Sequence, residues 1–310
     1  MAAALAFLAR HAAWMLFVGV FLGLLLPTLA QWLRPLLPPA VVLILLIALL
    51  RVDWSAMAGY LRRPLLIVAL TVWMLLASPI LTWTLVPPLG LPDSLTTALI
   101  LMAAAPPILS GAAFALLLGL DAALAVVVGL IATLLTPLTL PPLALLLLGL
   151  ELQVGVGELM GRLALVVGLA FFGALALRRG LGPARVARAA DPLDGVMVLL
   201  LLVFAVAVMD GVTATLLAEP LQVALWLAAA CLANPALQLL SALVFARFGI
   251  RLALTAGILA GNCNMGLLLA ALPAESDSGV VLFFAVAQIP MYIIPALFLP
   301  LYRRLIARWG

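Results

Sequence analysis

Long, uninterrupted apolar runs fill this sequence and restrict it to one broad class of fold. Of the 310 residues, 68% are hydrophobic and only 8% are charged, with a mean hydropathy of +1.39. A water-soluble domain of this length needs more charge to cover its surface, and the strands of a membrane barrel alternate apolar with polar residues. A helix of about 20 apolar residues is long enough to cross a bilayer. The sequence therefore predicts an all-α polytopic membrane protein.

Ten apolar runs qualify as membrane spans. They cover residues 12–33, 36–50, 64–86, 94–118, 122–148, 157–177, 194–209, 221–246, 252–272 and 279–301. The first run follows Arg10 and His11, but no convincing cleavage site comes after it. We therefore interpret it as a retained transmembrane helix and not as a signal peptide.

The basic residues support a count of ten spans. The chain has no lysine, so all 15 basic residues are arginines. With ten spans, only Arg34 and Arg162 fall on one side of the membrane and all other arginines fall on the opposite side. Such a bias marks the cytoplasmic side of a membrane. We expect an inner (plasma) membrane protein with both termini in the cytoplasm.

Residues that carry catalysis or bind metals are scarce. The acidic residues all map to loops or helix ends. A charge buried in the membrane usually marks an ion or proton pathway, so this pattern argues against a proton pump and a voltage sensor. His11 is the one histidine, and Cys231 and Cys263 lack partner ligands at a metal-binding spacing. We predict no metal site, no cofactor and no enzymatic activity, because no nucleophile–base pair is visible.

Two polar interruptions lie inside apolar spans. The stretch APPILSG interrupts the span at 94–118, and GNCN interrupts the span at 252–272. Proline removes a backbone donor and clashes with the preceding turn, and glycine permits unwound backbone. The residues expected to break the helices are Pro106, Pro107, Gly111 and Gly261.

The positions of the breaks predict an inverted repeat. Each interrupted span is the fourth of five in its half of the chain, residues 1–150 and 151–310. An odd number of spans gives the two repeats opposite orientations in the membrane. Paired interruptions in inverted halves indicate a secondary transporter with discontinuous helices. A polar cluster in one helix can instead join neighbouring helices, but the paired breaks favour a solute site.

Candidate solute- or ion-binding residues are the polar groups at the breaks and in neighbouring spans. Side-chain amides can satisfy backbone groups that a break exposes, and they can also contact a solute. If the breaks cross inside the membrane, half-helix N-termini there offer partial positive charge to an anion. In the neighbouring spans, solute contact and hydrogen bonding within or between helices both stay open. The candidates are Ser110, Asn262, Cys263 and Asn264 at the breaks, and Thr133, Thr136, Asn234, Gln238 and Gln288 nearby.

Several stretches, taken in order, resemble one known family. They are FVGVFLGLLLPTL, LRPLLPP, LRRPLLI, LLLGLDAALAVVVGLIATLLTPLTLPPL and GNCNMGLLLAALP. Their order and spacing resemble the bile acid:sodium symporter family over nearly the whole chain. The resemblance implies a panel domain of spans 1, 2, 6 and 7 and a core domain of spans 3–5 and 8–10. It also implies that the broken spans 4 and 9 cross in the core and that the solute binds between the domains.

The chain departs from this family at the sodium ligands. The resemblance implies that serine, threonine, asparagine, glutamine and glutamate oxygens hold sodium in the family. Asn264 keeps the signature amide and Asn262 adds a second, but the other matching side chains offer no oxygen. We therefore predict that the sodium sites are weakened or lost. The matching positions are Met74, Gly111, Ala112, Ala125, Gly129, Leu259 and Cys263.

The leading hypothesis is a secondary transporter of small or amphipathic organic anions that works by alternating access. Sodium coupling is doubtful or lost, for the reason just given. The alternative is a non-transporting membrane sensor or scaffold that kept the transporter fold. We expect the lipid bilayer and a small organic anion as partners, and no nucleic acid.

Overall fold

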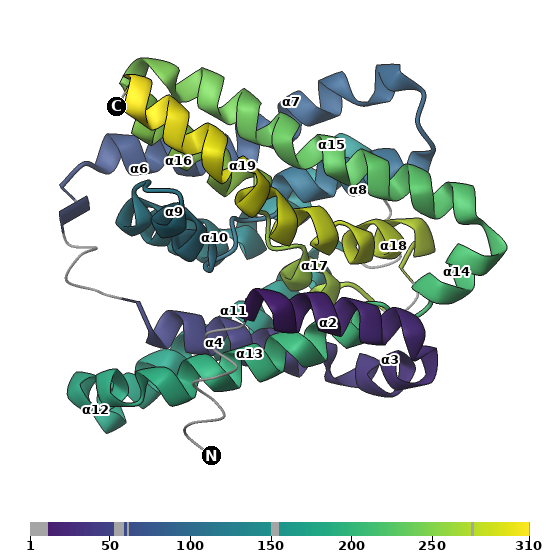
Figure 1. Cartoon of the computed structure of the whole chain (residues 1–310), viewed down its shortest axis with the longest axis horizontal. Coiled ribbons are helices and arrows are strands. Elements are labelled where there is room, and N and C mark those ends of the chain that lie inside the picture. The colour runs from purple at the N-terminus through teal and green to yellow at the C-terminus, as the bar shows by residue number, and fades with distance from the viewer. Residues whose placement is uncertain (1–11, 53–58, 61, 150–154, 274–275, 310) are drawn as a thin grey trace. The chain divides into compact units, whose positions relative to one another are not determined.

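The structure, a computed structural model, describes residues 12–52, 59–60, 62–149, 155–273 and 276–309 (Figure 1). Within these ranges the regular secondary structure is helical, apart from one isolated β-bridge. Arg10 and His11, which enter the predictions on topology and on metal sites, lie outside the described residues. The chain forms two compact units, and each unit draws on both halves of the sequence.

Unit 1 comprises Met1–Val52, Arg162–Leu225 and Leu269–Ala271. Its central helix is α13, because α2, α3 and α4 all pack on it. The main elements are α2 (Ala12–Leu25), α3 (Pro27–Leu33), the 3₁₀ turn η1 (Arg34–Leu36), α4 (Leu37–Leu50), most of α11 (Val156–Leu181), α12 (Pro183–Arg188), α13 (Ala190–Ala207) and α14 (Val212–Ala218).

Unit 2 comprises Asp53–Gly161, Trp226–Leu268 and Leu272–Gly310. Its longest uninterrupted helix is α10, which packs against α6, α8, α9 and α16. The main elements are α6 (Pro64–Val72), the π-helical turn η2 (Trp73–Ala77), α7 (Ser78–Leu85), the 3₁₀ turn η3 (Pro87–Leu89), α8 (Asp93–Ala104), α9 (Gly111–Leu117), α10 (Ala122–Leu148), most of α15 (Pro220–Phe245), the 3₁₀ turn η4 (Ala246–Phe248), α16 (Ile250–Gly261), most of α17 (Met265–Ala271), α18 (Ser278–Val286) and α19 (Gln288–Trp309).

Seven helices in the described residues are long and apolar enough to cross a membrane. They are Pro27–Leu50, Pro64–Leu89, Ala122–Leu148, Val156–Leu181, Ala190–Ala218, Pro220–Phe248 and Ser278–Trp309. The other three predicted spans coincide with α2, which has 14 described residues, and with the interrupted pairs α8/α9 and α16/α17. The arrangement of ten spans as two inverted repeats therefore stays a prediction.

The predicted boundary between the first two spans, 12–33 and 36–50, is wrong, because the second span begins at Pro27. We expected a single helix over residues 12–33, but α2 ends at Leu25 and a separate helix begins at Pro27. Leu26 between them has φ −122° and ψ 70°. A proline disfavours helical backbone in the residue before it, so Pro27 accounts for the break.

Two glycines let α2 approach α13 closely. A Cβ atom added at Gly23 would lie 2.7 Å from both the Met209 Cβ and the Val206 carbonyl oxygen. One added at Gly19 would lie 2.9 Å from the Ala205 Cβ. The Gly-x-x-x-Gly spacing puts both glycines on one face of α2, the arrangement that brings membrane helices into close contact.

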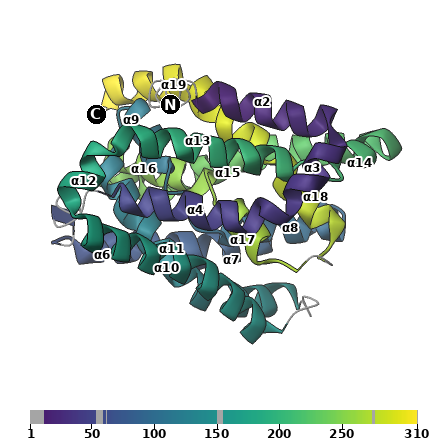
Figure 2. The ribbon, with the colours of Figure 1, turned by 90° about the horizontal axis from the view of Figure 1, so that it is seen from below.

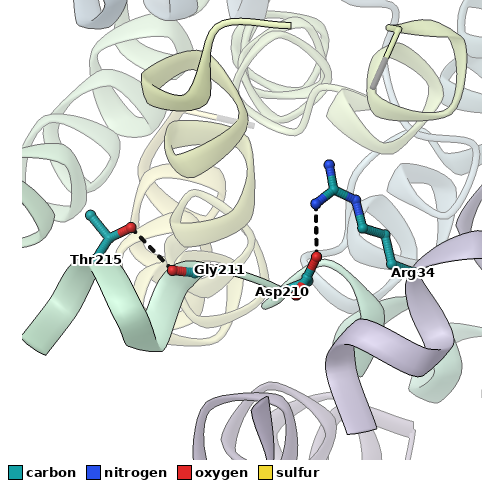
Figure 3. A network of polar contacts seen from close by, with 4 residues as sticks. All are labelled: Arg34, Asp210, Gly211 and Thr215. Carbon is teal, nitrogen blue, oxygen red and sulfur yellow. Dashed lines mark hydrogen bonds and ion pairs between the residues drawn. The ribbon is translucent and has the colours of Figure 1, made fainter. Parts of the chain in front are cut away.

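Ion pairs hold both ends of α13. Arg34 Nη1 lies 2.8 Å from Asp210 Oδ2, just beyond the end of α13 (Figure 3). Arg51 Nη2 lies 3.0 Å from Asp194 Oδ2, near its start. Gly211 follows Asp210 with a φ of 79°, which lets the chain turn into α14. Because both pairs are partly exposed, each contributes at most about 1 kcal/mol.

We predict that replacing Gly23 with alanine destabilises unit 1 by about 1–3 kcal/mol, because the new methyl group meets backbone and a neighbouring Cβ. Thermal unfolding of the detergent-purified protein measures the effect. Gly161→Ala is the matched control, since an added Cβ there meets nothing within 4 Å. Equal melting temperatures for the two variants would contradict the close packing of α2.

Candidate functional site

Both predicted helix interruptions lie in unit 2. The first separates α8 from α9, where Ala105 turns to extended backbone with φ −69° and ψ 142°. The second separates α16 from α17, where Asn262 has φ −103° and ψ 75°. The residues around both breaks are almost all buried.

The two interruptions pair with one another through their backbones. Pro107 and Cys263 form an antiparallel β-bridge, the one piece of β-structure among the described residues. Two hydrogen bonds flank it: Ile108 N donates to the Asn262 carbonyl at 2.9 Å, and Asn264 N donates to the Pro106 carbonyl at 2.7 Å. Unpaired backbone groups are costly inside a membrane, so each break satisfies part of what the other exposes. We call this pairing, residues 105–110 with 262–264, the crossing.

Asn262 carries a buried oxygen atom without a hydrogen-bond partner. Its side chain is fully buried, and its Nδ2 donates to the Ile258 carbonyl at 2.8 Å, near the end of α16. Its Oδ1 accepts no hydrogen bond. An unsatisfied acceptor of this kind costs about 1–3 kcal/mol and calls for a specific explanation. Asn262 is therefore the candidate residue with free capacity to bind a donor or a cation.

The other candidates at the crossing differ in exposure and in bonding. Cys263 is buried and its Sγ lies 2.9 Å from the Ala260 carbonyl oxygen. Asn264 is half-buried and caps α17, because its Oδ1 accepts from Leu267 N at 3.0 Å. Ser110 is exposed, immediately before α9.

A buried chain of hydrogen bonds joins three helices beside the crossing. Asn234 Nδ2 donates to the Gly261 carbonyl at 2.6 Å, and Gln238 Nε2 donates to Asn234 Oδ1 at 2.6 Å. Tyr302 OH donates to Gln238 Oε1 at 2.6 Å. The bond between Gln238 and Asn234 lies within α15, whereas the bonds to Gly261 and Tyr302 join α15 to α16 and α19. A role of either residue in solute binding stays a prediction.

Glycines on α16 make room for this chain of hydrogen bonds. A Cβ at Gly257 would lie 2.7 Å from the Gln238 carbonyl oxygen, and one at Gly261 would collide with the Gln238 side chain. Sequence reasoning identified Gly261 only as a helix breaker, and it missed Gly257 and Tyr302. The Gly-x-x-x-Gly spacing of Gly257 and Gly261 was the available signal for a tight helix contact.

Thr133 and Thr136 bond to their own helix, and Gln288 at the start of α19 bonds to the preceding helix α18. Thr133 Oγ1 donates to the Gly129 carbonyl at 2.7 Å, and Thr136 Oγ1 donates to the Ala132 carbonyl at 2.8 Å. Gln288 Nε2 donates to the Phe284 carbonyl at 3.0 Å. All three side chains are buried, so local bonding explains how their polar groups are tolerated in apolar surroundings.

The positions that the resemblance assigns to sodium ligands lie in apolar surroundings. Leu259 and Ala125 are each 1% exposed, and Met74 is 3% exposed. A Cβ added at Gly111 would lie 3.8 Å from Leu259 Cδ2, so these two positions are neighbours. Gly129 faces the first break, with its added Cβ 3.4 Å from Leu109 Cδ2. In the described part of the chain, no group of three or more His, Cys, Asp or Glu side chains could hold a metal ion.

A polar cluster that sequence reasoning missed ties the start of α10 to α16. Asp121 Oδ1 accepts from Leu124 N at 2.9 Å and caps α10, and Asp121 N donates to Thr255 Oγ1 at 3.3 Å. Tyr60 OH donates to Asp121 Oδ2. Burial, followed by the hydrogen bond to Asp121, raises the pKa of Tyr60 to about 12. The tyrosine therefore stays a neutral donor throughout the physiological pH range.

A family model confirms the resemblance inferred from the sequence. The model of the Sodium Bile acid symporter family matches residues 38–218, more than half of the chain. The chain belongs to this family. Because the family consists of transporters, and because several helices can cross a membrane, the chain is a multi-pass membrane transport protein.

The match to the symporter family covers the first half of the crossing only. It includes the APPILSG break and ends before the GNCN break. The prediction that the resemblance runs over nearly the whole chain is thus supported only for residues 38–218. None of the curated proteins matches the chain.

We predict that Tyr302→Phe lowers stability by about 1–3 kcal/mol, because it leaves the buried Gln238 Oε1 without its donor. Tyr292→Phe on the same helix is the matched control, since the structure shows no hydrogen bond between that hydroxyl and any other described residue. Thermal unfolding compares the two variants. If both melt alike, the hydrogen-bond chain through Gln238 does not stabilise unit 2.

Proposed function

We propose that this chain is a secondary transporter of small or amphipathic organic anions that works by alternating access. The crossing carries the proposal. Two interrupted helices from distant parts of the sequence pair their backbones in buried surroundings. Irregular backbone at membrane depth is tolerated where it is buried or lines a cavity, and in transporters it builds the solute site.

The class of solute follows from the family. The family is named for bile acids, which are amphipathic organic anions. The amides of Asn262 and Asn264 and the hydroxyl of Ser110 are the polar groups we assign to solute or ion contact. Asn262 Oδ1 supports this assignment, because it is buried and unsatisfied.

Alternating access needs two domains that each move as a rigid body. The division into unit 1 and unit 2 supports such bodies, since each has its own packed interior. Unit 1 contains α2, α4, α13 and most of α11, and unit 2 contains both interrupted helices. We propose that they act as the panel and the core, in an inner membrane with both termini in the cytoplasm.

We further propose that sodium coupling is weak or lost. Sodium requires several oxygen ligands to replace its hydration shell, and Leu259, Ala125 and Met74 provide none. The oxygens at the crossing that could still bind an ion are its backbone carbonyls and the side-chain oxygens of Asn262, Asn264 and Ser110. Without a carboxylate, a site built from them binds sodium far more weakly.

Replacing Asn264 with leucine should abolish transport with only a modest loss of stability, about 1 kcal/mol from the lost helix cap. Uptake of a radiolabelled bile acid into proteoliposomes, with thermal unfolding in parallel, measures both effects. Asn264→Ser is the control. Because serine also caps helices but has no amide group, this variant shows whether transport depends on the amide or on the helix cap. Normal uptake by the leucine variant would remove Asn264 from the solute site.

Melting temperatures in sodium and in potassium at equal ionic strength should coincide. A ligand at ten times its dissociation constant stabilises a protein by roughly 1.4 kcal/mol. A working sodium site would therefore raise the melting temperature measurably. A sodium-specific increase would show that carbonyl and amide oxygens of the crossing hold the ion. If the bile acid stabilises the protein but is never taken up, the protein is a sensor or scaffold and not a transporter.

A further inference from the structure

Five arginines from three segments gather at one end of unit 2. Tyr302 near the end of α19 bonds to Gln238 near the end of α15, and α19 also packs against α16. The C-terminal ends of α15 and α19 therefore lie close to the start of α16. Figures 1 and 2 both show α16 beside the C-terminus. We call this surface the arginine face. Its members are Arg247 in η4, Arg251 in the first turn of α16, and Arg303, Arg304 and Arg308 in the last turns of α19.

The charges of the arginine face have no acidic partner in the part of the chain that the structure describes. All five side chains are exposed. The ion pairs of Arg34 with Asp210 and of Arg51 with Asp194 lie in unit 1 and involve none of these five arginines. A preference for basic residues on the cytoplasmic side explains the sign of these charges, but it does not require five of them to converge. Such a surface attracts anions strongly.

Exposed aromatic rings accompany the arginines. Phe248 is 50% exposed and Trp309 is 66% exposed. Arg247 Cζ lies 4.8 Å from the centre of the Phe248 ring, and Arg308 Cζ lies 5.2 Å from that of Trp309. Aromatic rings at the ends of membrane helices mark the level of the lipid headgroups. Guanidinium groups beside such rings can therefore reach lipid phosphates.

We propose that the arginine face binds the headgroups of anionic phospholipids. A guanidinium group donates two parallel hydrogen bonds to a phosphate, and five of them suit clustered anionic headgroups better than zwitterionic ones. The site is separate from the crossing and does not depend on which solute is carried. It also has a structural consequence, because α16 runs from Arg251 directly to the second break. Bound lipid thus steadies the helix that supplies half of the crossing.

The test compares phosphatidylglycerol with phosphatidylcholine. Each lipid is titrated into the purified protein in neutral detergent, and the melting temperature is followed. We expect a larger increase with phosphatidylglycerol. The triple variant Arg303→Gln, Arg304→Gln, Arg308→Gln should bind it on the order of a hundred-fold more weakly, at roughly five-fold per arginine. The corresponding lysine variant should keep most of the effect, because it keeps the charge.

The matched control is Arg185→Gln with Arg188→Gln, two exposed arginines of α12 in unit 1. This control should respond to phosphatidylglycerol like the natural protein. Since the replaced side chains of the face are exposed, the triple variant should melt normally without lipid. Equal responses to the two lipids, or an unchanged response of the triple variant, would overturn the proposal. So would the same increase produced by inorganic phosphate alone, which would indicate a simple anion site.

Discussion

The pairing of two interrupted backbones is the constraint on which unit 2 depends. Pro106 and Pro107 have no amide hydrogen and cannot continue a helix, so the first break is built into the sequence. A single break of this kind would leave polar backbone without partners at membrane depth. The hydrogen bonds from Ile108 to Asn262 and from Asn264 to Pro106 supply those partners. Each interrupted helix therefore needs the other in order to be stable.

The surroundings of the crossing explain which polar groups remain free. Hydrogen bonds of Asn234, Gln238 and Tyr302 form the chain that joins α15, α16 and α19. The Oδ1 of Asn264 caps α17. Asn262 Oδ1 has no hydrogen-bond donor among the described residues. The resemblance places oxygen ligands at the positions of Leu259 and its apolar neighbours, so we propose that the crossing is kept as architecture while its ion-binding chemistry is reduced. This combination is what we expect of a transporter whose coupling differs from that of its family.

The two breaks could be predicted from the sequence because their causes are local. Proline acts within one or two residues, and the break at Leu26 could have been predicted from Pro27 by the same rule. The predicted role of Gly111 and Gly261 as unwound residues is wrong, because Gly111 begins α9 and Gly261 ends α16. Hydrogen-bond partners such as Tyr302 and Gln238 are 64 residues apart, and no local pattern joins them. Asn262 and Asn234 looked alike in the sequence. Only the packing of α15 against α16 shows that Asn234 is bonded and that Asn262 keeps a free oxygen.

Labelling of Cys263 tests most directly whether the crossing is a solute pathway. Its thiol is 2% exposed in this structure, at the bridge with Pro107. In a Cys231→Ala background, a small water-soluble thiol reagent is applied to the folded protein, with and without a saturating bile acid. Alternating access predicts slow labelling of Cys263, and protection by the bile acid. A thiol that stays unreactive until the protein unfolds would contradict a pathway through the crossing.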